Sequence, residues 1–149
     1  MAVRSLKIET VVDAPLATVF DFFSRAENLE RITPTKLRFE ILTPLPIQMR
    51  PGALIDYKLR LFGFPMYWTT EITVWEPGVR FVDVQRKGPY KLWEHEHRFE
   101  AIGDKTRMTD SLRYEAPGGV LEPLIHALFV RRQVEAIFSH RAKVITDLF

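Results

Sequence analysis

The residues best suited to chemistry in this sequence are two histidines in KLWEHEHRFE, at residues 91–100. If this stretch is a β-strand, the side chains at even positions from 94 to 100 share one face, and all of them are charged. The odd positions then share the other face: Trp93, His95, His97 and Phe99. Because Trp and Phe favour the interior, we expect both imidazoles to point inward, where each needs a hydrogen-bond partner.

Two aspartates are predicted on the same inner face. Asp83 alternates with Phe81 and Gln85 in RFVDVQ, and Asp110 alternates with Met108 and Leu112 in TRMTDSLRY. Consecutive antiparallel strands bring such residues side by side. Burying an unpaired carboxylate or imidazole costs roughly several kcal/mol for the charged form, so these groups should pair with one another or with a bound molecule.

Three interpretations of this polar group stay open. It is a satisfied structural network, an anchor for the polar group of a mostly apolar ligand, or a site of catalysis or metal binding. An imidazole oriented by a carboxylate is a suitable general base for an aldol-type cyclisation or a dehydration, which makes His95, His97 and Asp110 the catalytic candidates. The H-x-H pair with Asp110 has the ligand types of a metal site, but this spacing is common by chance, and we predict no metal. His126 and His140 are predicted at the surface or at a cavity rim.

The elements that position these residues follow from the hydrophobic spacing. Residues 6–12 alternate like a strand, and residues 16–32 have helical spacing, as two short helices interrupted near 24–28. Two-residue alternation between turn signals then predicts six more strands, which form an antiparallel meander. Their residues are 35–42, 53–61, 66–75, 80–87, 91–100 and 106–116. In the third of these, the predicted inner residues are Trp68, Thr70, Ile72 and Val74.

The last segment, residues 122–149, reads as one long helix whose apolar stripe changes direction. Leu124 and Leu128 lie nearly half a turn away from Val134 and Phe138. Either the helix is broken near residues 129–132, or its first two turns contact something different, such as the mouth of a cavity. Arg131 and Arg132 are expected on a solvated face; the alternative is a contact with an acidic partner or an anionic ligand.

Composition limits the possible classes of protein. The 149 residues, 46% hydrophobic and 27% charged, fit one domain spanning residues 1–149. Net charge is only +2 and the basic residues are scattered, so we expect no nucleic-acid partner. The chain has no cysteine, no signal-like segment and no apolar run long enough for a membrane span, which predicts a cytoplasmic protein. One Asn and three Gln hint weakly at a thermophilic source.

This order of elements resembles the helix-grip fold of the START / birch-pollen-allergen superfamily (SRPBCC), and within it the small bacterial polyketide cyclase/dehydrase-like proteins. The likeness rests on VVDAPLATVFDFF, AENLERITP, WEHEHRFE and DSLRYEAPGG, and it spans nearly the whole chain. The resemblance implies an α+β protein in which a curved antiparallel sheet of about seven strands wraps a long C-terminal helix. It also implies a ligand cavity between the sheet and that helix.

The sequence therefore predicts a non-enzymatic binding protein, without a cofactor, for a small hydrophobic or amphipathic ligand of lipid-, isoprenoid- or polyketide-like type. One alternative is a cofactor-free cyclase or dehydrase; another is a module whose long helix or sheet edge binds a protein partner of unknown identity. Nucleotide-binding and serine-hydrolase motifs are absent from the sequence. The predicted ligand-binding residues are Tyr57, Trp68, Phe81, Asp83, Trp93, His95, His97, Phe99, Asp110 and Tyr114.

Overall fold

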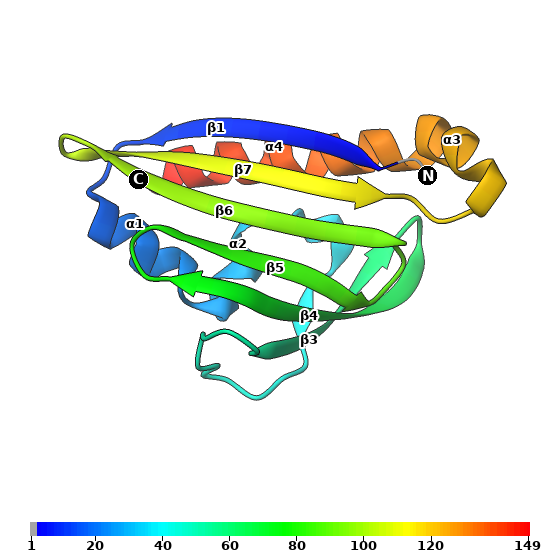
Figure 1. Cartoon of the computed structure of the whole chain (residues 1–149), viewed down its shortest axis with the longest axis horizontal. Helices are drawn as coiled ribbons and strands as arrows, with labels where there is room; N and C mark the ends of the chain where they lie inside the picture. The colour runs from blue at the N-terminus through cyan, green and yellow to red at the C-terminus, as the bar shows by residue number, and fades with distance from the viewer. Residues whose placement is uncertain (1–2) are drawn as a thin grey trace.

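A computed structural model describes residues 3–149 as a curved seven-stranded antiparallel sheet facing a long C-terminal helical segment (Figure 1). The strand order is β1-β7-β6-β5-β4-β3-β2, so the strands from β2 to β7 pair in chain order and β1 closes the far edge against β7. The predicted antiparallel meander is confirmed. The strands are β1 (Arg4–Val12), β2 (Glu40–Ile41), β3 (Leu54–Leu61), β4 (Phe64–Glu76), β5 (Arg80–Lys87), β6 (Leu92–Ile102) and β7 (Lys105–Glu115).

Two short helices follow β1, as predicted. Helix α1 (Leu16–Phe23) begins directly after Pro15, which is extended and needs no hydrogen-bond partner for its nitrogen. A 3-10 turn, Ala26–Asn28, separates α1 from α2 (Leu29–Ile32). The buried face of α1 packs on rings and aliphatic side chains at one end of the sheet and closes that end of the core.

The predicted strand at residues 35–42 is largely wrong. Only the two residues of β2 pair with β3, whereas Thr35–Leu37 forms a 3-10 turn and Arg38 adopts a left-handed conformation with φ of 50°. The turn follows Pro34 directly, and proline favours a turn start over strand pairing. Leu37 still points inward and is buried.

A β-bulge also changes the predicted inner face of β4. The register between β4 and β5 shifts between Ile72 and Val74. A bulge adds one residue to one strand, so the alternation of faces changes beyond it. As a result Trp75, rather than the predicted Val74, packs against the core, where its ring lies 5.3 Å from that of Phe81.

The C-terminal segment is continuous but irregular. A 3-10 turn (Gly119–Leu121) leads into α3 (Glu122–Ile125), then a π-helical turn (His126–Val130), then α4 (Arg131–Leu148). The residues that its first turns bury are Glu122, His126 and Val130, so the apolar stripe changes direction because Leu124 and Leu128 do not face the core. The helix is not broken, and its first two turns leave Leu124 and Leu128 exposed instead of covering a cavity mouth.

The packing of this segment against the sheet forms the main core. From α4, the side chains of Val134 and Phe138 contact the inner residues of the central strands. None of the helices within residues 3–149 is long and apolar enough to cross a membrane.

Candidate functional site

A cavity of about 150 Å³ lies between the concave face of the sheet and α4. An apolar protein cavity of about this volume can accept a molecule the size of benzene. Its wall combines aliphatic and aromatic side chains. Among the aromatic ones, the Trp68 ring stacks on Tyr57 with centroids 5.7 Å apart and meets Trp93 edge-on at 5.2 Å. The polar residues that border the cavity, apart from the tyrosines and tryptophans, are Thr33, Thr70, Asp83, His95, His97 and Arg141.

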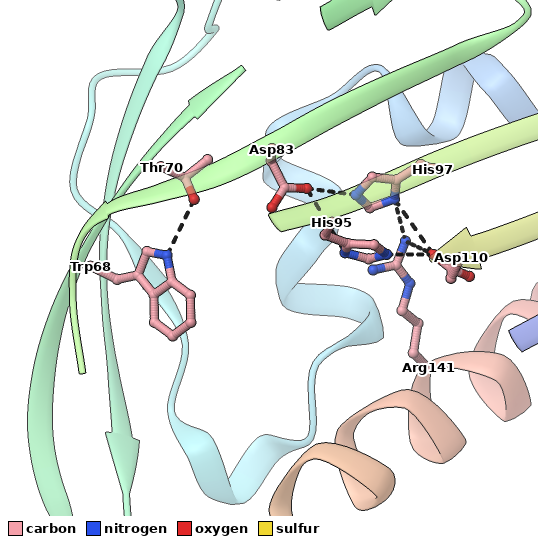
Figure 2. Close-up of polar contacts among 7 residues, drawn as sticks. All are labelled: Trp68, Thr70, Asp83, His95, His97, Asp110 and Arg141. Atoms are coloured by element: carbon pink, nitrogen blue, oxygen red, sulfur yellow. Dashed lines mark hydrogen bonds and ion pairs between the residues drawn. The ribbon is translucent and has the colours of Figure 1, made fainter. Parts of the chain in front are cut away.

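Five buried or nearly buried residues form the polar cluster shown in Figure 2: Asp83, His95, His97, Asp110 and Arg141. Asp83 comes from β5, the two histidines from β6, Asp110 from β7 and Arg141 from α4. The cross-strand register places Asp83 opposite His95, and His97 opposite Asp110. The two imidazole rings lie against each other with centroids 3.7 Å apart. Each ring lies between the two carboxylates, with one nitrogen on the side of Asp83 and the other on the side of Asp110.

The histidines use their Nε2 atoms on different aspartates. His97 Nε2 lies 2.6 Å from Asp83 Oδ2, and His95 Nε2 lies 2.8 Å from Asp110 Oδ1. The remaining nitrogen of His95, Nδ1, is 3.9 Å from Asp83 Oδ2, too far for a hydrogen bond. Three members that border the cavity therefore have unused hydrogen-bonding capacity: Asp83 and His95 as acceptors, and Arg141, whose buried Nε has no partner.

Arg141 is the member of the cluster that the sequence analysis missed. Its Nη2 lies 2.9 Å from His97 Nδ1 and 3.4 Å from Asp110 Oδ1, and its guanidinium carbon lies 5.4 Å from the Phe23 ring centre. A signal was present, because Arg141 follows Phe138 by three residues on the face that α4 buries. A charged residue on a buried stripe indicates a buried ion pair.

Arg141 fixes the protonation of His97. A guanidinium only donates hydrogen bonds, so His97 Nδ1 accepts and carries no proton. The proton of the neutral ring is therefore on Nε2, which donates to Asp83. Burial, together with the neighbouring His95 and the charge of Arg141, holds the pKa of His97 well below its ordinary value, in agreement with this neutral state.

The two aspartates have opposite electrostatic environments. Burial alone would raise the pKa of Asp110, but the Arg141 charge and the hydrogen bond from His95 outweigh it and hold that pKa well below its usual range. Asp110 is therefore ionised and accepts the proton of His95 Nε2. Burial raises the pKa of Asp83, which lies farther from the guanidinium in the network and next to the cavity.

Three members of the cluster have the atom types of a metal site. Donor atoms of Asp83, His95 and His97 lie within 4.8 Å of one another, so Asp83 rather than Asp110 is the carboxylate positioned as a third ligand. His97 does not fit that role as it stands, because its Nε2 carries the proton. A ligating histidine needs a free lone pair on the metal side and normally donates its other N–H to an acceptor. Arg141 has the opposite effect, because it donates to His97 Nδ1 and so leaves the proton on Nε2, the nitrogen that would have to bind the metal. It also adds a positive charge beside the site.

The other predicted residues divide between the cavity and its surroundings. Tyr57, Trp68, Phe81 and Trp93 line the cavity, and Tyr90, which the sequence analysis did not single out, lines it too. Three predicted residues lie outside its lining: Phe99 packs on Phe20 and Phe23, Asp110 lies behind His95, and Tyr114 faces the start of the C-terminal helical segment.

The predicted surface position of His126 is wrong. This histidine is 8% exposed, and its Nε2 lies 2.8 Å from the hydroxyl of Tyr114. It begins the π-helical turn, whose altered register directs the ring toward the sheet. Gln85 also has a structural contact, because its side chain bonds the backbone N–H and C=O of Tyr90 and holds the turn before β6.

Comparisons with known proteins agree with this architecture. The model of the family described as "Polyketide cyclase / dehydrase and lipid transport" matches residues 12–139. No curated protein matches the sequence. Because identities are low, the similar solved structures below establish the fold alone.

Three such structures cover nearly the whole chain. The Zhui aromatase/cyclase from Streptomyces sp. R1128 has a TM-score of 0.72 at 15% identity, over 98% of this chain and 93% of that one. Ara h 8.0201 has a TM-score of 0.64 at 15% identity, over 97% and 98%. A START superfamily protein from Mycobacterium smegmatis has a TM-score of 0.65 at 15% identity, over 99% of both chains. The predicted helix-grip fold is thus confirmed. The chain belongs to the polyketide cyclase / dehydrase and lipid transport family, whose model matches most of its length.

Proposed function

We propose that this protein binds a small, mostly apolar molecule that carries one polar group. The observation that carries the proposal is the cavity itself, whose wall is aromatic and aliphatic and whose only charged side chains belong to the polar cluster. Small-molecule sites have this composition, in which apolar walls supply affinity and a few polar groups fix the orientation of the ligand. The family description, which includes lipid transport, supports the same class of function.

The size of the cavity limits what it holds. At about 150 Å³ it accommodates a single ring or a short branched chain. The lining residues that keep partial exposure include Leu29, Met49 and Ile137. A longer lipid-, isoprenoid- or polyketide-like ligand would therefore place its polar end at the cluster and leave the cavity past these side chains.

Native mass spectrometry of the purified protein, followed by extraction and identification of any released molecule, tests the proposal. Titration with single-ring aromatic probes gives a second test, because Trp68 and Trp93 line the cavity and their fluorescence should change on binding. Ala26→Leu adds volume to the lining and should abolish binding, whereas the exposed Ala136→Leu on α4 is the matched control. An empty protein that binds none of the probes would contradict the proposal.

A second candidate, a cofactor-free cyclase or dehydratase, is favoured by the state of His95. Its Nε2 is held by ionised Asp110, and its Nδ1 has the free lone pair of a general base. In a dehydration, Nδ1 would take a proton from the carbon beside a carbonyl, the C–O bond of a β-hydroxyl would break, and the resulting His95 imidazolium would give that proton to the departing oxygen to form water.

This candidate makes a different prediction from simple binding. His95→Gln should abolish the loss of water from a single-ring β-hydroxy ketone while leaving its binding measurable. The partly exposed His140→Gln is the control and should keep full activity. If substrate binds and no product forms in the wild type, the binding function stands without catalysis.

A further inference from the structure

The hydrogen bonds of Arg141 determine which atoms of the polar cluster can still bind a ligand. Because Arg141 donates to His97 Nδ1, the single proton of His97 lies on Nε2 and is already given to Asp83 Oδ2 at 2.6 Å. His97 therefore has no donor or acceptor left for a ligand. Its contribution to the cavity is the apolar face and edge of a neutral ring, which stacks on Phe81 at 4.1 Å.

The position of the proton on the second histidine, His95, is determined by its contact with Asp110. Ionised Asp110 only accepts, so the proton on His95 Nε2 is given to it at 2.8 Å. In a neutral imidazole the other nitrogen then has a lone pair and no proton. That nitrogen, His95 Nδ1, faces Asp83 Oδ2 across 3.9 Å without a hydrogen bond.

Two acceptors therefore meet where the polar cluster borders the cavity: His95 Nδ1 and the carboxylate of Asp83. Arg141 borders the cavity too, but its charge is already paired with Asp110, at 3.4 Å. A carboxylate of a ligand placed at the two acceptors would face the lone pair of His95 Nδ1 on one side and the negative charge of Asp83 on the other. A hydroxyl group would donate its proton to one acceptor. If a proton is bound between His95 and Asp83, the same hydroxyl oxygen accepts it, so a hydroxyl suits either state.

We propose that this site selects ring-sized ligands whose polar group is a hydroxyl, and that it rejects the corresponding carboxylates. Arg141 is the positioning residue for this selectivity, since it fixes the proton on His97 and thereby leaves Asp83 and His95 as acceptors. The inference rests on the proposed binding function and adds the chemistry of the ligand. An unmade hydrogen bond to a buried acceptor is costly, so we expect discrimination of at least about tenfold.

Titration calorimetry at pH 7 with three probes of similar size tests the selectivity. The expected order of affinity is phenol, then toluene, then benzoate, with phenol at least about tenfold tighter than benzoate. Asp83→Asn replaces one acceptor with an amide donor at the same volume, so the ratio of phenol to benzoate affinity should fall. Asp147→Asn, at an exposed position on α4, is the matched control and should leave the ratio unchanged.

The outcomes separate the two proposals. If benzoate binds as well as phenol, the selectivity is wrong and the binding function stands. If none of the three probes binds, the binding function and the selectivity both fail. The positioning role of Arg141 has its own readout in the wild type, the ¹⁵N chemical shifts of the histidine rings. An unprotonated Nδ1 and a protonated Nε2 on His97 are expected; a proton on His97 Nδ1 would overturn the assignment.

Discussion

Two groups of buried polar residues lie between the sheet and the C-terminal helical segment, and they differ in how completely they are satisfied. The first is the polar cluster around His95 and His97. The second, which we call the helix-start network, joins Arg4, Tyr114, Glu122 and His126. Arg4 donates two hydrogen bonds to Glu122, at 3.2 and 3.1 Å, and the Tyr114 hydroxyl pairs with His126 Nε2 at 2.8 Å.

The helix-start network has no part in the cavity lining, whereas four of the five residues of the polar cluster border the cavity. Both groups contain a histidine, a carboxylate and an arginine, so residue types alone do not distinguish them. The difference is that the polar cluster leaves acceptor atoms free beside empty space. Buried polar residues therefore indicate a ligand site only where their hydrogen-bonding capacity is incomplete and faces a cavity.

The largest effect is expected from Arg141→Met. The methionine fills similar space but leaves Asp110 buried without its positive partner, and breaking a buried ion pair from one side costs about 3–5 kcal/mol. Urea denaturation should therefore show a large loss in the free energy of unfolding. The exposed Arg132→Met on the same helix is the control, and an equal loss there would contradict a special role for Arg141.

Glu122→Gln should have a smaller effect, in the helix-start network. The side chain of Glu122 is almost fully buried, but that of its partner Arg4 is 32% exposed and can turn toward water when the pair is broken. We expect a loss of about 1–2 kcal/mol in the free energy of unfolding, with probe affinity at the cavity unchanged. A change in probe affinity above about twofold would remove the distinction between the two groups.

Local patterns in the sequence were sufficient for most of the architecture. The alternation in β6 directed both histidines inward, and the proline and turn residues marked the limits of the meander. The failures occurred where the backbone departs from regular geometry. The bulge after Ile72 and the π turn at His126–Val130 each add a residue to a repeating pattern, and no periodicity reveals that in advance.

The site was harder to predict for a different reason. The two Asp–His contacts lie between neighbouring strands, so register alone brings the residues close. Arg141 comes from α4, more than 40 positions away from His97, and only the packing of helix on sheet brings the two together. The protonation of His97, and thus the polarity of the cavity, depends on this one long-range contact.

The pH dependence of stability should reflect the buried histidines of both groups. The pKa of His97 and that of His126 are lowered, in each case mainly by burial, so the folded protein keeps both neutral while the unfolded chain protonates them near pH 6.5. The contribution of the two neutral histidines to the free energy of unfolding is therefore complete above about pH 6.5 and decreases as the pH drops below it. From pH 7 to 5 we expect a decrease of up to about 2 kcal/mol for each histidine.

Variants separate the two contributions to this decrease. His126→Gln should remove part of it, and the remainder belongs to His97. Asp83 acts in the opposite sense, because burial raises its pKa and the folded protein gains a proton there on acidification. Asp83→Asn should therefore give a steeper decrease. A flat stability profile from pH 7 to 5 in Asp83→Asn, where this opposing contribution is removed, would show that neither histidine is held neutral.

The smallest effect is expected from Tyr114→Phe, which tests the boundary between the two groups most sensitively. The substitution removes one hydroxyl and leaves His126 Nε2 without its partner, at a cost of about 1 kcal/mol in the free energy of unfolding. The sequence analysis assigned Tyr114 to the ligand site, but its hydroxyl belongs to the helix-start network. Fluorescence titration should therefore give an unchanged probe affinity, whereas a loss of affinity would mean that the cavity extends to the start of the helix and that the two groups act as one site.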